Sequence, residues 1–90
     1  MPTIKFTNAL KRFFPTLSET DISADDLTQV LEELENIHPG LKSYIIDEQG
    51  ALRQHVNIFI DGDLIHDRHK LSDAFQDNSE IYIMQALSGG

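Results

Sequence analysis

Polar and apolar residues alternate at the start of the chain and again towards its end. The run from Thr3 to Thr7 places Ile4 and Phe6 on one side of an extended segment, and this period of two predicts a half-buried strand. Later runs are rich in β-branched and aromatic residues, which favour strands. The strands predicted in this way cover residues 3–7, 17–22, 52–60, 64–65 and 80–85.

One segment repeats its apolar residues at helical spacing. Ser23 is its expected N-cap, with Asp26 three residues later, and the pair Pro39-Gly40 is expected to end it. Its apolar stripe predicts a helix with one buried face. That stripe consists of Leu27, Val30, Leu31, Leu34 and Ile37.

The segments between these elements have the composition of turns and loops. Residues 8–15 are expected to form a loop or turn, and residues 41–45 a short helical turn. The pair Asp61-Gly62 is a hairpin signal. Residues 66–70 are expected to form a charged loop, after which a turn packs back onto the core through Leu71, Ala74 and Phe75.

This order of elements predicts an α+β fold, with a mixed sheet of four to five strands packed on one main helix. The strands that precede and follow the helix are expected to run parallel or to lie two positions apart. No linker or repeat divides the 90 residues. We therefore expect one domain at residues 1–86 and a flexible tail at residues 87–90.

Composition narrows the classes of function. The formal net charge of −8 opposes binding to nucleic acid and favours a partner with a basic surface, although acidity also promotes solubility. The chain has no cysteine, which excludes a disulfide or a thiolate nucleophile on its side chains. No signal peptide and no apolar run long enough to span a membrane are recognisable. A cytoplasmic location is expected.

The histidines do not form a recognisable site. His66 and His69 lie near Asp63 and Asp67, but their spacing matches no strong metal-ligand motif and the segment is typical of an exposed loop. No arrangement of nucleophile and base is indicated, and no phosphate-binding glycine loop is present. We expect no bound metal and no catalysis by this chain alone.

Alternation along the later strands predicts a second surface. If Val56 and Ile58 face the helix, then Phe59, Tyr82 and Met84 point to the opposite side of the sheet. An uncovered apolar patch on a small protein usually marks a protein contact. The alternative is that residues 41–50 cover these side chains, and the sequence leaves both interpretations open.

The C-terminus supplies the one unusual chemical group. Leu87 and Ser88 lead into Gly89 and Gly90, and glycine residues can lie extended in a channel too narrow for other residues. The group that they carry is the α-carboxylate of Gly90. A Gly-Gly end also arises by chance, so its meaning depends on the domain that precedes it.

Four stretches, taken in order, resemble the MoaD/ThiS family of ubiquitin-like sulfur carriers with a β-grasp fold, and among them the longer, CysO-like carriers. The resemblance extends over nearly all of the chain. The stretches are Ala9-Leu10-Lys11-Arg12, residues 56–62 (Val-Asn-Ile-Phe-Ile-Asp-Gly), residues 77–83 (Asp-Asn-Ser-Glu-Ile-Tyr-Ile) and residues 86–90 (Ala-Leu-Ser-Gly-Gly).

The resemblance implies that an E1-like adenylyltransferase binds the domain and receives the tail of Leu87, Ser88 and Gly89. Gly90 would be adenylated and then thiocarboxylated, and ATP and magnesium would belong to the partner. A sulfur-acceptor enzyme would follow, of the molybdopterin synthase large subunit, thiazole synthase or cysteine synthase type. Two alternatives stay open: the small subunit of molybdopterin synthase, and a ubiquitin-like protein modifier joined through Gly90 to lysines.

Overall fold

Eight helices and strands follow one another along residues 1–85, which are the residues that the computed structural model describes. The longest helix has 11 residues, and no helix within this range is long and apolar enough to cross a membrane. The elements are β1 (Thr3–Phe6), α1 (Asn8–Phe13), β2 (Thr20–Asp21), α2 (Leu27–Ile37), α3 (Leu41–Ile45), β3 (Val56–Ile60), β4 (Asp63–Leu64) and β5 (Glu80–Gln85).

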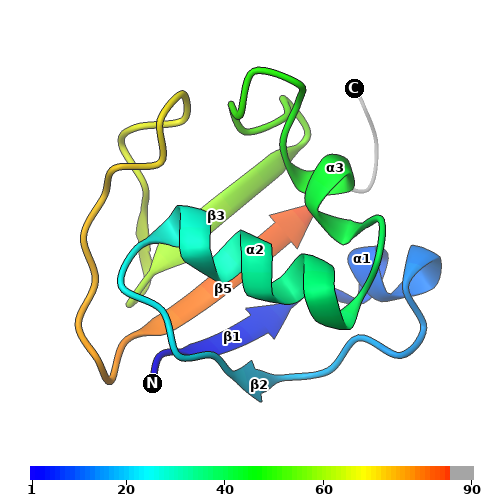
Figure 1. The fold of residues 1–90 in the computed structure, drawn as a ribbon, viewed down its shortest axis with the longest axis horizontal. Coiled ribbons are helices and arrows are strands. Elements are labelled where there is room, and N and C mark those ends of the chain that lie inside the picture. Colours follow the sequence, from blue (N-terminus) through cyan, green and yellow to red (C-terminus); the bar gives the residue numbers. More distant parts are fainter. Residues whose placement is uncertain (86–90) are drawn as a thin grey trace.

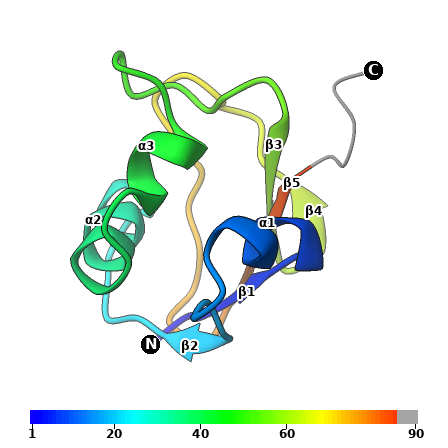
Figure 2. The ribbon, with the colours of Figure 1, turned by 90° about the vertical axis from the view of Figure 1, so that its right-hand side faces the viewer.

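The strands form one mixed sheet in the order β2-β1-β5-β3-β4. The central pair, β1 and β5, is parallel, and all other pairs are antiparallel. Helices α2 and α3 cover one face of this sheet (Figures 1 and 2). The predicted α+β architecture is confirmed. Strands β2 and β3, which flank α2 and α3 in the sequence, run in the same direction as expected, but both β1 and β5 lie between them, one strand more than expected.

The core lies between the apolar stripe of α2 and the inward side chains of the sheet. Leu27, Val30, Leu31 and Leu34 are buried, as the helical spacing predicts. They belong to one cluster with inward residues of the three central strands, among them Ile4, Phe6, Val56, Ile58, Ile81 and Ile83. Ile37 was predicted to join them, but it is 54% exposed because α2 ends at this residue.

The start of α2 differs from the prediction. Its N-cap is Asp26 rather than Ser23, and the Asp26 carboxylate accepts a hydrogen bond of 2.8 Å from the amide of Gln29. The Gln29 side chain in turn accepts one of 2.8 Å from the amide of Asp25. These reciprocal bonds satisfy amides of the first turn in the manner of a capping box, one turn later than expected. The predicted end of the helix before Pro39-Gly40 is confirmed.

Residues 8–15 were expected to form a loop or turn, but Asn8–Phe13 form the helix α1. α1 has six residues, of which only the neighbours Ala9 and Leu10 are buried, so its sequence shows no apolar residues repeated at helical spacing. Backbone bonds mark both of its ends: the amide of Lys11 donates to the carbonyl of Thr7, and the amide of Phe14 donates to that of Leu10. α1 therefore turns the chain sharply at the end of β1.

The long strand predicted at residues 52–60 begins only at Val56. The amide of Leu52 donates to the carbonyl of Arg68, and the amide of Arg53 to that of Ile45, so this segment is bonded to a loop and to the end of α3 instead of the sheet. The strand predicted at residues 17–22 is reduced to Thr20–Asp21, and the one predicted at residues 64–65 lies one residue earlier, at Asp63–Leu64. Of the turn residues expected in the core, Leu71 is buried, Phe75 is partly buried and packs against the core, and Ala74 is exposed.

The predicted hairpin at Asp61-Gly62 is confirmed. Ile60 pairs with Asp63, so the two residues between them form the whole loop. Both have positive φ, 51° at Asp61 and 88° at Gly62. A two-residue turn of this kind matches the twist of the flanking strands, and Gly and Asp tolerate it best.

Candidate functional site

The end of β5 is the place from which the chain continues to its terminus. Gln85 is the last residue of this central strand and pairs with Val56 of β3. On the other side, the amide of Thr7 donates to the carbonyl of Ile83 and the Thr7 hydroxyl accepts from the amide of Gln85, each at 3.3 Å. The predicted tail residues Leu87, Ser88, Gly89 and Gly90 lie outside the described residues. In the sequence, only Ala86 separates them from a strand end that is held from both sides.

The outer patch, defined as Phe59, Tyr82 and Met84, lies on the sheet face away from α2 and α3. Phe59 and Tyr82 are directly paired across β3 and β5, and Met84 pairs with Asn57 on the same face. All three patch side chains are partly exposed. Residues 41–50 include α3, which lies on the opposite side of the sheet (Figure 2), so this segment does not cover the patch.

Sequence reasoning missed one member of this surface. Leu64 of β4 pairs with Phe59, which places it in the same outward row, and its side chain is 48% exposed. Lys5 of β1 pairs with Tyr82 on the side away from Phe59, so it extends the same outward row across the sheet. The signal was available, because a two-residue hairpin fixes which residue of the second strand faces Phe59. The patch is therefore wider than the three residues predicted.

A hollow lies where α1 meets the outer face of β5. The groups that surround it are apolar, amide, phenolic and cationic, so it suits recognition of a partner better than proton transfer. Its lining consists of Thr7, Asn8, Ala9, Arg12, Tyr82, Met84 and Gln85. Two of its groups are unsatisfied by residues 1–85: the buried Gln85 Oε1 has no hydrogen-bond partner there, and the exposed Arg12 forms no ion pair there.

The start of β5 is bonded much more completely. Ser79 is only 1% exposed, and its hydroxyl donates to Asp61 Oδ2 at 2.7 Å while accepting from the amide of Gln76 at 2.8 Å. Asp61 Oδ1 accepts from the amide of Glu80 at 2.9 Å. The Glu80 amide and the Ser79 hydroxyl hold the pKa of Asp61 below its ordinary value. These bonds attach the β3–β4 hairpin to the first residues of β5.

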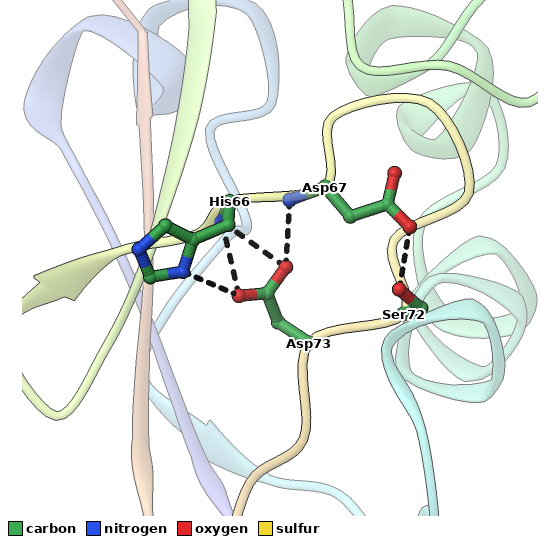
Figure 3. Close-up of polar contacts among 4 residues, drawn as sticks. All are labelled: His66, Asp67, Ser72 and Asp73. Atoms are coloured by element: carbon green, nitrogen blue, oxygen red, sulfur yellow. Dashed lines mark hydrogen bonds and ion pairs between the residues drawn. The ribbon is translucent and has the colours of Figure 1, made fainter.

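The charged loop predicted at residues 66–70 is present, and the carboxylates of Asp67 and of Asp73, which lies just beyond it, organise its backbone (Figure 3). Asp73 accepts hydrogen bonds from the amides of His66 and Asp67, and its Oδ2 lies 3.3 Å from His66 Nδ1. Asp67 accepts from the Ser72 hydroxyl and from the amides of Lys70 and His69, which lowers its pKa to about 2. The two carboxylates thus act as turn-forming acceptors.

The histidine cluster considered in the sequence does not assemble. Within residues 1–85, no group of three or more His, Cys, Asp or Glu side chains is placed to hold a metal ion.

Arg68, in the same loop, reaches the start of β3. Its guanidinium donates to Asn57 Oδ1 at 2.8 Å and to the carbonyls of Arg53 and Val56 at 2.8 and 2.9 Å. Because Asn57 is the partner of Met84, Arg68 fixes the border of the outer patch next to the end of β5. Nothing in the sequence indicated this role, since the three acceptors lie 11 to 15 residues away along the chain.

Comparison with known proteins gives both a family and a fold. The sequence model of the ThiS family matches residues 4–90. Among solved structures, the chain is similar to that of the Amycolatopsis orientalis BexX/CysO complex, with 16% identity, a TM-score of 0.82 and full coverage of both chains. It is similar to Mycobacterium tuberculosis CysO, with 23% identity, a TM-score of 0.80 and coverage of 96% and 99%.

A third similar structure is the small archaeal modifier protein 1 of Methanosarcina acetivorans, with 28% identity, a TM-score of 0.76 and coverage of 98% and 94%. No curated protein sequence matches the chain. The structural matches confirm the predicted ubiquitin-like β-grasp fold.

Proposed function

The chain belongs to the ThiS family, and from this premise we propose that it is a sulfur carrier, adenylated and then thiocarboxylated at the carboxylate of Gly90. Membership confirms the resemblance seen in the sequence, and at the level of the family the chain is a ubiquitin-like sulfur carrier or modifier. The observation that carries the proposal is that the family match continues through the terminal Gly-Gly.

The proposed chemistry needs only the terminal carboxylate from this chain. A carboxylate oxygen of Gly90 attacks the α-phosphorus of ATP, pyrophosphate leaves, and an acyl-adenylate forms. Hydrosulfide then attacks the acyl carbon and expels AMP, and loss of the remaining S–H proton leaves a thiocarboxylate. Two glycine residues suit this chemistry because no side chain obstructs either attack. ATP, magnesium and the groups that stabilise the transition states belong to the activating enzyme.

An E1-like adenylyltransferase is the proposed activating partner, and the outer patch is its proposed docking surface. Aromatic residues and methionine are enriched in protein contacts, and Phe59, Tyr82 and Met84 lie beside the strand end that leads to the tail. A sulfur-acceptor enzyme would use the same end afterwards. The Amycolatopsis orientalis structure contains CysO in a complex with BexX, which supports the idea that such a carrier docks on a second protein.

A second candidate function is protein modification. The Methanosarcina acetivorans relative, at 28% identity, is a small archaeal modifier protein. In a modifier, the same acyl-adenylate would lead to an isopeptide bond between Gly90 and a lysine amine. The two functions share the activation step and differ in what attacks the acyl carbon.

The test combines the purified chain with the E1-like adenylyltransferase of its own host, ATP, magnesium and sulfide. We expect the full chain to gain a thiocarboxylate, seen by intact mass. Deletion of Gly89 and Gly90 should abolish this product and leave urea unfolding unchanged, whereas Gly90→Ala retains a terminal carboxylate and should keep part of the activity. A thiocarboxylate formed on the shortened chain would contradict the proposal. Conjugates of higher mass that disappear with Gly90 would favour the modifier.

The patch is tested separately by Phe59→Ser. Removing one partly exposed aromatic side chain from the outward row should raise the KM for the carrier and leave the rate at saturation nearly unchanged, because Phe59 does not touch the reacting atoms. Equal urea midpoints for the variant and the wild type would show that the effect is not one of folding. An unchanged KM would remove the outer patch from the interface.

A further inference from the structure

Four rings form a second surface, called here the aromatic face: Phe13, Phe14, Tyr44 and His55. Tyr44 of α3 lies at the centre, with ring centroids 5.4 Å from Phe13, 5.6 Å from Phe14 and 5.8 Å from His55. Phe14 and Tyr44 are partly buried and pack against the core, which accounts for their presence. Phe13 is 60% exposed, so burial in the core does not explain an aromatic residue at this position.

The aromatic face lies at the same end of the sheet as the last residue of β5. α1 follows β1, and because β1 is parallel to β5, both strands end on this side. His55 directly precedes Val56, which is the partner of Gln85. Figure 1 shows α1 and α3 together at this end. α1 stands between the two surfaces, since Arg12 lines the hollow beside the outer patch and Phe13 contacts Tyr44.

The charge around α1 is opposite to that of the rest of the protein. The whole chain has 15 acidic and 7 basic residues, yet residues 1–18 contain no Asp or Glu. α1 has Lys11 and Arg12 in its last turn. Neither forms an ion pair within residues 1–85, whereas Lys5 is paired with Glu80 and Lys42 with Glu32. An exposed ring next to two cations that have no ion pair within residues 1–85 is complementary to a segment that carries carboxylates beside an apolar side chain.

We propose that the aromatic face, with Lys11 and Arg12, is a second docking surface that receives an acidic segment of the activating enzyme. This inference rests on the proposed function, because it names a further contact with the same partner. The partner's apolar side chain packs on Phe13 and Tyr44, and its carboxylates pair with Lys11 and Arg12. The enzyme then contacts the domain on both sides of α1, next to the strand end that leads to the tail. These two contacts fix the orientation in which the domain presents its tail to the enzyme.

The chain offers a matched control for this surface. Ile37, at the end of α2, is 54% exposed and is not one of the four residues of the aromatic face, so it matches Phe13 in exposure without belonging to that face. The experiment measures the affinity of the full chain for the host's E1-like adenylyltransferase by titration calorimetry. The variants are Phe13→Ser, Ile37→Ser and the double charge reversal Lys11→Glu with Arg12→Glu.

We expect Phe13→Ser to weaken binding about tenfold, as loss of one aromatic anchor does, while Ile37→Ser leaves the affinity unchanged. The charge reversal should slow association and reverse the effect of salt on its rate, since the variant repels the acidic segment. Urea midpoints of all variants check that they are folded.

Equal affinities for Phe13→Ser and the wild type would overturn the inference, as would a loss shared by Ile37→Ser. So would self-association of the wild type that Phe13→Ser abolishes, because the face would then bind a second copy. If the wild-type chain is adenylated normally but Phe13→Ser and the charge reversal bind the enzyme as the wild type does, the inference fails while the proposed function stands. If the wild type neither binds the enzyme nor forms an adenylate, both fail.

Discussion

The two ends of β5 differ in how completely their polar groups are bonded. At the start, Ser79 is buried, and its hydroxyl and the Asp61 carboxylate are satisfied by each other and by the amides of Gln76 and Glu80. At the end, the amide of Gln85 has only a 3.3 Å bond to the Thr7 hydroxyl, and its buried Oε1 has no partner within residues 1–85.

This difference separates stability from recognition along a single strand. A fully satisfied polar network fixes one arrangement of the chain, whereas an exposed group such as Arg12, which has no ion pair within residues 1–85, is available to a partner. The start of β5 therefore anchors the central strand to the hairpin and to β1. Its end leaves amide, cationic and apolar groups next to the residues that lead to Gly90. Three experiments test this division.

The largest effect on stability is expected for Ile81→Ala. Ile81 is fully buried in the first half of β5, and truncation of such a side chain costs about 2–5 kcal/mol of the free energy of unfolding. Met84→Ala, in the second half and on the outward face, should cost far less but weaken binding of the activating enzyme. Urea unfolding and enzyme titration of both variants measure the two effects. A Met84→Ala variant as unstable as Ile81→Ala would remove the distinction.

A smaller loss is expected for Ser79→Ala, about 1–3 kcal/mol, because the amide of Gln76 and the carboxylate of Asp61 each lose a buried partner. Ser72→Ala is the control, since it also removes a hydroxyl that donates to an aspartate, but on an exposed loop. Denaturation midpoints of the two variants should differ clearly. Equal midpoints would show that the network at the start of β5 contributes no more than a surface turn.

The smallest effect is a dependence on pH. The pKa of Asp61 is below its ordinary value of 3.8 in the folded chain, so ionised Asp61 contributes stability above that pH and loses it as the pH falls towards the folded pKa. Asp61→Asn cannot titrate. The stability difference between wild type and variant should therefore be constant near neutral pH and shrink below about pH 4. Urea unfolding at a series of pH values measures it, and a difference that grows in acid would contradict the assignment.

Much of the fold could be predicted because its signals are local. Period-two alternation placed Ile4 and Phe6 in the core, helical spacing placed Leu27 to Leu34, and Asp61-Gly62 fixed the hairpin. The errors arose where tertiary contacts decide. α1 has too few buried residues to show a helical period in the sequence. Asp26 is the N-cap in place of Ser23 because its carboxylate bonds to the amide of Gln29. β3 begins only at Val56 because the residues before it bond to the backbone of Arg68 and Ile45.

The site was predictable only in part. Alternation placed Phe59, Tyr82 and Met84 on one outward face, and the family resemblance pointed to Gly90, which lies outside the described residues. Arg68 could not be foreseen, because its three acceptors become neighbours only when the loop folds onto β3. The aromatic face escaped notice for a similar reason. Its rings come from the end of α1 and the residue that follows it, from α3 and from the loop before β3, and no sequence spacing joins these segments.

The most direct test of the carrier function is the intact mass of the protein isolated from its own host under mild, non-reducing conditions. The proposal predicts a population heavier by the exchange of one oxygen for one sulfur, located in the C-terminal peptide at Gly90. An unmodified mass, together with Gly-Gly branches on lysines of other proteins, would contradict it and identify a modifier.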